Sequence, residues 1–147
     1  MRKSSKQYDG LLNVIGHYKR FPAMRPFVGE SYSSSQSKTL LIAESFYLPN
    51  ECELHKEAET WYSSDESGLT ENEVPWVDCR GLIECNWSAD GHFIYRELER
   101  CLHESTGNGF VGVAFMNAFQ RPSCKEGESF KSFCAQLDIE HSVEVIN

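Results

Sequence analysis

The residues best suited to chemistry lie directly after two short apolar segments of the chain. Glu44 and Ser45 follow the first segment, Thr39–Ala43, and Asn117 follows the second, residues 110–115. A glutamate carboxylate can act as a general base, whereas a neutral serine hydroxyl is a poor one. An asparagine amide offers a hydrogen-bond donor and an acceptor together. These residue types therefore suit a site that recognises a polar group, with one carboxylate available for proton transfer.

Each of these residue types also has a structural interpretation, which the sequence leaves open. Glu44 and Ser45 are typical of residues that cap a following helix, and Asn117 is typical of a strand end where the amide bonds to the backbone. No Gly-x-Ser-x-Gly elbow surrounds Ser45, so the pattern does not indicate a serine hydrolase. The histidines show no metal-ligand spacing.

The pattern of apolar residues predicts strands and helices in alternation. We expect strands over 39–43, 110–115 and 141–147, with helices over 90–103 and 129–137 between them; Asp90 and Ser129 are the expected N-caps. Alternation of this kind is typical of a parallel sheet with helices on its faces. Ligands of such sheets bind beyond the carboxyl ends of the strands. This rule brings the loop Glu44–Pro49 next to the loop Met116–Pro122.

The remainder of the chain is less regular. Residues 1–24 form an N-terminal helical region with a helix over Tyr8–Tyr18, and prolines then favour an extended segment at Phe27 and Val28. Residues 49–89 read as an irregular insertion that contains a short helix over Leu54–Tyr62. Neither repeats nor a domain boundary are visible, so we expect one domain over residues 1–147.

Composition sets limits on the class of protein. The chain has 147 residues, of which 40% are hydrophobic and 12% aromatic. This composition is typical of a globular domain. A membrane-spanning helix needs roughly 20 apolar residues in succession, and no such segment or secretory signal is present, so we expect a cytoplasmic protein without a membrane partner. The formal net charge of −8 argues against tight, nonspecific binding of nucleic acid.

The six cysteines include no Cys-x-x-Cys pair, so we predict reduced structural thiols and no metal site. Cys101 and Cys134 in particular fall on apolar helical faces, where we expect buried side chains.

Three ordered blocks of sequence resemble a group of bacterial proteins with the uracil-DNA glycosylase-like fold. The blocks are Arg25-Pro26-Phe27-Val28-Gly29-Glu30, Leu41-Ile42-Ala43-Glu44-Ser45-Phe46-Tyr47 and Ala114-Phe115-Met116-Asn117-Ala118-Phe119-Gln120-Arg121-Pro122. This resemblance implies an α/β fold, a three-layer α/β/α sandwich with a short, mostly parallel sheet. It also implies a flipped base that rests on an aromatic ring while an amide reads its Watson–Crick edge.

The resemblance assigns roles to individual positions. Tyr47 matches the tyrosine that walls the pocket against bulkier bases, and Asn117 matches the asparagine that reads the base. Ser45 stands where the family has the aspartate that positions the attacking water, and Glu44 is the neighbouring carboxylate that would replace it. For the stacking ring the candidates are Trp61 and Tyr62, by their distance along the chain. The alternative for all three aromatic residues is a place in the core.

The family continues past the third strand to a loop whose histidine stabilises the departing base, and this chain ends at Asn147. His141 lies at the start of the expected third strand and therefore at the wrong end of the sheet to replace that histidine. We expect a fold that is incomplete at its C-terminus. The leading hypothesis is a protein without cofactor that recognises or excises a base in single- or double-stranded DNA. The alternatives are an inactive nucleotide- or protein-binding module and a fragment without activity.

Overall fold

A small mixed sheet lies at the centre of the protein. The computed structural model describes residues 2–87, 92–124 and 129–147. Its three strands, in the spatial order β1-β3-β2, are β1 (Phe27–Val28), β2 (Leu40–Ala43) and β3 (Ala114–Asn117). The strand β2 runs parallel to β3, with Leu40 opposite Ala114, whereas β1 is antiparallel to β3. The fold is therefore mixed α/β, and half of its strand pairing departs from the expected parallel arrangement.

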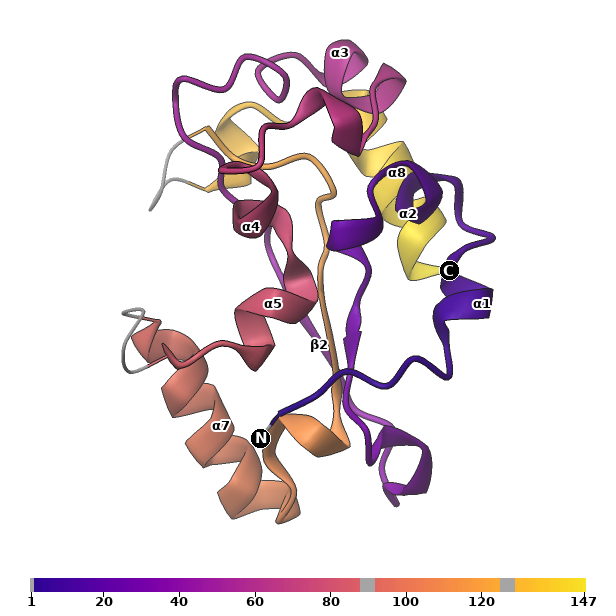
Figure 1. Ribbon diagram of the computed structural model, residues 1–147, viewed down its shortest axis with the longest axis vertical. Helices are drawn as coiled ribbons and strands as arrows, with labels where there is room; N and C mark the ends of the chain where they lie inside the picture. The colour runs from indigo at the N-terminus through magenta and orange to yellow at the C-terminus, as the bar shows by residue number, and fades with distance from the viewer. Residues whose placement is uncertain (1, 88–91, 125–128) are drawn as a thin grey trace.

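Helices surround the sheet. They are α1 (Asp9–Leu12), α2 (Gly16–Arg20), α3 (Ala58–Ser63), α4 (Val74–Val77), α5 (Cys79–Glu84), α7 (Phe93–Thr106) and α8 (Gln136–Ile146), with single 3-10 turns at Pro22–Met24, Tyr32–Ser34, Glu66–Gly68, Gly109–Gly112 and Phe130–Ser132. Figure 1 shows the strands running through the middle of the molecule, with α7 near one end and α3 near the other.

Local chemistry explains where the helices beside the sheet begin and end. The Asp78 carboxylate accepts the backbone N–H groups of Arg80 and Gly81 and so caps α5. The helix α7 ends at Gly107, whose φ is 78°. This is the left-handed conformation that glycine adopts at low cost. The expected N-cap of this helix, Asp90, lies outside the described residues.

The prediction of a strand over 39–43 is confirmed, and the second strand is displaced. Residues 109–112 form a 3-10 turn, and Gly109 within it has a φ of 60°. A residue with this left-handed backbone cannot continue an extended segment. The strand β3 begins after this turn at Ala114. The expected helix over Tyr8–Tyr18 is interrupted, because Ile15 between α1 and α2 has an extended backbone with ψ of 120°.

The prediction of a third strand over 141–147 is wrong, since residues 141–146 belong to α8. Val143, Val145 and Ile146 are β-branched and favour strands as isolated residues, but tertiary contacts decide here. Ser142 and Val145 are buried at helical spacing, and the Asp138 carboxylate accepts the Ala135 N–H at the start of the helix. The predicted helix over 129–137 is only a 3-10 turn followed by the first residues of α8.

The two cysteines expected on apolar faces are not buried as predicted. Cys101 is exposed and Cys134 is only half-buried. On α7 the apolar residues at the first turn are also exposed: the exposed fraction is 59% for Phe93 and 68% for Ile94. The apolar stripe of this helix therefore contacts the core through Leu98 and Leu102. Phe93 and Ile94 in its first turn remain exposed.

Candidate functional site

The loops after β2 and β3 lie against each other, as the parallel pairing predicts. Backbone N–H groups of the second loop donate to carbonyls of the first: Ala118 N to Ala43 O at 2.8 Å, Phe119 N to Glu44 O at 2.9 Å and Ser123 N to Phe46 O at 2.7 Å. The ladder of β2 and β3 thus continues past the strand ends. It fixes the polar residues of the two loops at one edge of the sheet.

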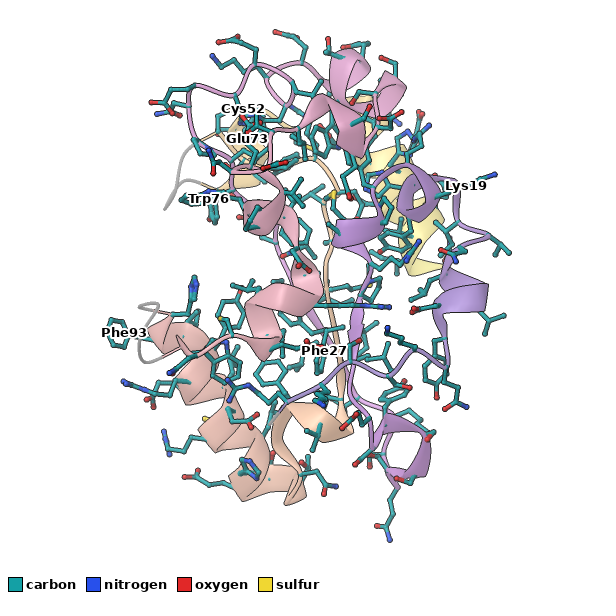
Figure 2. The ribbon with its side chains drawn as sticks, in the orientation of Figure 1. Lys19, Phe27, Cys52, Glu73, Trp76 and Phe93 are labelled. Atoms are coloured by element: carbon teal, nitrogen blue, oxygen red, sulfur yellow. The ribbon has the colours of Figure 1, made fainter. Side chains whose placement is uncertain are left out.

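A cavity of about 850 Å³ opens at this edge. Three residues of the expected site line it, namely Ser45, Tyr47 and Asn117. The other lining residues come from the first loop, α4, α5 and the start of α7: Phe46, Pro75, Trp76, Asp78, Gly81, Leu82, Cys85, His92, Phe93, Ile94 and Tyr95. In Figure 2 the labelled side chains of Trp76 and Phe93 lie on one side of the molecule, one from α4 and the other from the first turn of α7.

Asn117 is buried at the carboxyl end of β3, with an exposed fraction of 3%. Its backbone carbonyl accepts a hydrogen bond of 2.6 Å from Gln120 Nε2. Among the described residues its side-chain amide has no hydrogen-bond partner, so a backbone-capping role for this asparagine has no support in them. Asn117 lines the cavity, and an amide carries both a donor and an acceptor.

Ser45 carries a second buried polar group. Its Oγ is buried, and within the described parts of the chain no hydrogen-bond partner reaches it. Ser45 lines the cavity, but this Oγ is buried, so the hydroxyl is not exposed to a ligand in this arrangement.

Glu44 lies outside the cavity. Its side chain is exposed, and Oε1 accepts a hydrogen bond of 2.8 Å from Ser129 Oγ. The carboxylate that does line the cavity is Asp78, whose Oδ1 already holds the N-terminus of α5. The first loop therefore places Ser45 along the cavity and sends its carboxylate to the surface.

Trp61 and Tyr62, the two candidates for the stacking ring, lie in the core and not along the cavity. The Trp61 ring stacks on Phe21 with centroids 4.3 Å apart, and its Nε1 donates to Gln120 O at 3.1 Å. The Tyr62 ring stacks on His141 at 3.9 Å, and its hydroxyl donates to Asp138 Oδ1 at 3.0 Å. Burial is the main reason that the pKa of Tyr62 is raised, and the Asp138 carboxylate adds to the shift.

Sequence reasoning predicted Tyr47 but missed the other aromatic residues that line the cavity. Trp76 falls in the irregular insertion, and Phe93 and Tyr95 belong to a helix whose sequence reads as an ordinary amphipathic one. Tyr95 packs edge-on against Phe115 of β3 at 5.8 Å, and burial raises its pKa to about 12. A signal was available in the first turn of the helix, where Phe93, Ile94 and Tyr95 are apolar at successive positions. Three successive residues cannot all lie on one buried helical face.

A separate cluster of buried polar groups lies at the far end of the second loop. Arg121, 1% exposed, donates to both carboxylate oxygens of Asp138 at 2.9 and 2.7 Å. The same guanidinium donates to the carbonyls of His55, Lys56 and Phe133. It thereby joins the residues before α3, the second loop and α8.

Two buried histidines have no hydrogen-bond partners among the residues that the structure describes. Burial lowers the pKa of His17 to about 3, assisted by the neighbouring Arg20 and His141. Burial likewise lowers the pKa of His55 to about 4, with a contribution from Arg121. Both imidazoles are therefore neutral at pH 7 and act as core residues.

Comparisons of this chain with protein-family models, with curated proteins and with solved structures found no match. Across residues 2–87, 92–124 and 129–147, no group of three or more His, Cys, Asp or Glu side chains is arranged to hold a metal ion. None of the helices in the same residues has the length and apolar character needed to span a membrane.

Proposed function

We propose that this protein has the uracil-DNA glycosylase-like fold and binds an unstacked nucleobase of DNA in the cavity between Tyr47 and Asn117. The observation that carries the proposal is the Asn117 amide, which is buried, lines the cavity and leaves its hydrogen-bonding groups free of the described residues. A base edge presents a donor beside an acceptor, and an amide complements this pattern with two hydrogen bonds.

The walls of the cavity suit a planar ring. The volume of the cavity, about 850 Å³, is of the size that is typical of small-molecule sites. Trp76 and Phe93 line it with exposed fractions of 53% and 59%, so their rings offer aromatic surface to a ligand. Stacking of a base on such a ring contributes about 1–3 kcal/mol. We therefore assign the stacking role to these rings in place of Trp61 and Tyr62.

Recognition is the part of the activity that the geometry supports best. Excision needs a group that positions water at the glycosidic carbon, and Glu44 is turned outward to Ser129. Ser45 lines the cavity, but its hydroxyl is buried and is a poor general base. The resemblance and the cavity thus favour base binding, and they do not favour rapid hydrolysis.

Fluorescence anisotropy with a labelled single-stranded oligonucleotide that carries one uracil tests the proposal. Low salt is the appropriate condition, because a chain with net charge −8 gains little from the phosphate backbone. We expect binding that weakens about tenfold in Asn117→Ala, since loss of a paired base contact costs about 1–3 kcal/mol. Tyr62→Phe is the matched control, because this core residue does not line the cavity.

Two results would count against the proposal. The first is equal affinity of the wild-type protein and Asn117→Ala for the uracil oligonucleotide. The second is equal affinity of the wild-type protein for that oligonucleotide and for one with an abasic site in place of uracil. Base release from the same samples, detected by strand cleavage in alkali, measures excision separately from binding.

A further inference from the structure

The strand β2 leaves one hydrogen-bonding edge open. The carbonyls of Thr39 and Ala43 accept hydrogen bonds from β3 and the loop after it, so the odd-numbered residues of β2 face β3. The backbone groups of Leu40 and Ile42 therefore point to the opposite side. No strand pairs with them in the part of the chain that the structure describes, where β2 is the last strand of the sheet.

The side chains along this edge are apolar and partly in solvent. Leu40 is 44% exposed and Ile42 is 50% exposed, whereas Leu41 and Ala43, on the other face, pack against the core. Sheet edges are normally protected by a charge, a proline or a bulge, and Thr39–Ala43 contains none of these. An apolar, uncapped edge of this kind is a template for pairing with another strand.

The charges that flank the edge are both held by neighbours within the chain. Lys38 Nζ donates to the carbonyls of Tyr32, Ser33 and Ser35 at 2.7, 2.8 and 2.9 Å. Glu44 at the other end accepts from Ser129. Both flanking side chains thus have partners within the chain, and Leu40 and Ile42 between them are 44% and 50% exposed.

We infer that this edge is the interface of a homodimer in which β2 of two copies pairs antiparallel about a two-fold axis. Residues directly opposite each other must share a face of the sheet, and the axis that also brings Lys38 opposite Glu44 passes through Leu41. Leu41 then lies opposite Leu41 of the second copy, and Leu40 lies opposite its Ile42. The Leu40 and Ile42 positions become the hydrogen-bonded pairs, which is the direction in which their free backbone groups already point.

The same register is the reason why we expect the partner strand to come from a second copy of this chain. The segment from Lys38 to Glu44 is complementary to itself around Leu41, so Lys38 of each copy lies opposite Glu44 of the other. Opposite charges at facing positions stabilise antiparallel pairs. The two apolar residues on the exposed face, Leu40 and Ile42, meet in the same register. Pairing joins the three-stranded sheets of the two copies into one sheet and covers the open β2 edge of each copy.

Sedimentation equilibrium of the purified protein across a wide range of concentrations tests the dimer. We expect the average mass to rise from one chain to two in the wild type, and to stay at one chain in Ile42→Lys, which places a charge at the centre of the edge. Val14→Lys is the matched control, because Val14 is 81% exposed and distant from β2 in sequence. A wild type that stays monomeric at all concentrations overturns the inference. This holds even if a different protein binds the edge.

Charge reversal tests the register. We expect Lys38→Glu, which sets two carboxylates opposite each other, to weaken the dimer about tenfold, and the double variant Lys38→Glu/Glu44→Lys to restore it. Equal dimerisation of the wild type and the single variant would contradict the register.

A cysteine at the two-fold axis gives a covalent readout. Opposite residues at a non-hydrogen-bonded pair have Cα atoms about 4.5 Å apart, which is within the range that a disulfide spans. In a Cys101→Ser background, which removes the exposed native thiol, we expect Leu41→Cys to form an oxidised dimer and Leu40→Cys to remain uncrosslinked. The reverse pattern would overturn the register. Because Asn117 is not part of this edge, Asn117→Ala should dimerise like the wild type even if base binding fails.

Discussion

Asn117 and Arg121 are four positions apart on one loop, and both are buried, but their polar groups have opposite surroundings. Arg121 makes five hydrogen bonds to Asp138 and to three backbone carbonyls. Asn117 presents an amide to a cavity and makes no side-chain hydrogen bond with the described residues. Buried polar groups are normally paired, so the first arrangement stabilises the fold, and the second is what the proposed base binding would use. The two ends of this segment therefore divide into a structural part and the part to which we assign the proposed binding.

The largest effect should come from the structural part. Arg121→Leu leaves the Asp138 carboxylate buried without its partner. We expect this change to lower the free energy of unfolding by about 3–5 kcal/mol. Urea unfolding followed by circular dichroism measures this difference. Arg100→Ala, which breaks an exposed ion pair on α7, is the matched control and should leave the midpoint unchanged. Equal midpoints for the two variants would contradict the structural role of Arg121.

Acid should unfold the protein through its buried histidines. The folded-state pKa of His17 is about 3 against an ordinary value of 6.5, so the unfolded chain binds the extra proton between these two values. Stability from this group is therefore complete above pH 6.5 and falls as the pH drops. The loss reaches up to about 2 kcal/mol near pH 5.

The variant His17→Phe keeps an aromatic ring against Phe21, with which His17 stacks at 5.2 Å, and removes the titration. Urea unfolding at several pH values between 7 and 5 should show a smaller loss of stability in His17→Phe than in the wild type. Parallel pH dependences of the two proteins would show that His17 does not carry this effect.

Asn117→Ala should change stability far less than Arg121→Leu. The Asn117 amide has no hydrogen-bond partner among the described residues, so its removal breaks no such bond there, and we expect the free energy of unfolding to change by less than about 1 kcal/mol. Urea unfolding of the ligand-free protein measures it. A loss as large as that of Arg121→Leu would mean that Asn117 is a structural residue, and the contrast between the two ends of the loop would fail.

The sequence predicted where the candidate site lies better than which residues line it. The apolar segment at 39–43 is recognisable because a short continuous apolar run between turn residues is a strong local signal, although Leu40 and Ile42 are exposed. The parallel pairing to β3 follows from general rules of topology. Trp61 and Tyr62 could not be placed, since their distance from the cavity depends on how the irregular insertion packs. Trp76 could not be placed either, since it lines the cavity only because α4, the helix that contains it, packs beside the cavity. The helix at the C-terminus is not predictable locally, because the buried bond between Arg121 and Asp138 has no signature in local sequence.

The smallest effect should come from a change at Glu44, and a variant without any effect is itself informative. The side chain is exposed and bonds to Ser129 on the outside of the loop, so Glu44→Gln keeps an acceptor in the same place. We expect the affinity for the uracil oligonucleotide and any base release to remain within error of the wild type, measured by anisotropy and by alkaline strand cleavage. Ser45→Ala is the companion on the same loop: Ser45 lines the cavity but its Oγ is buried, so we expect the affinity to change by less than a few fold. If Glu44→Gln abolished base release while Ser45→Ala did not, the loop would have to turn its carboxylate inward when DNA binds. In that case the division between the outer and inner residues of this loop would hold only for the free protein.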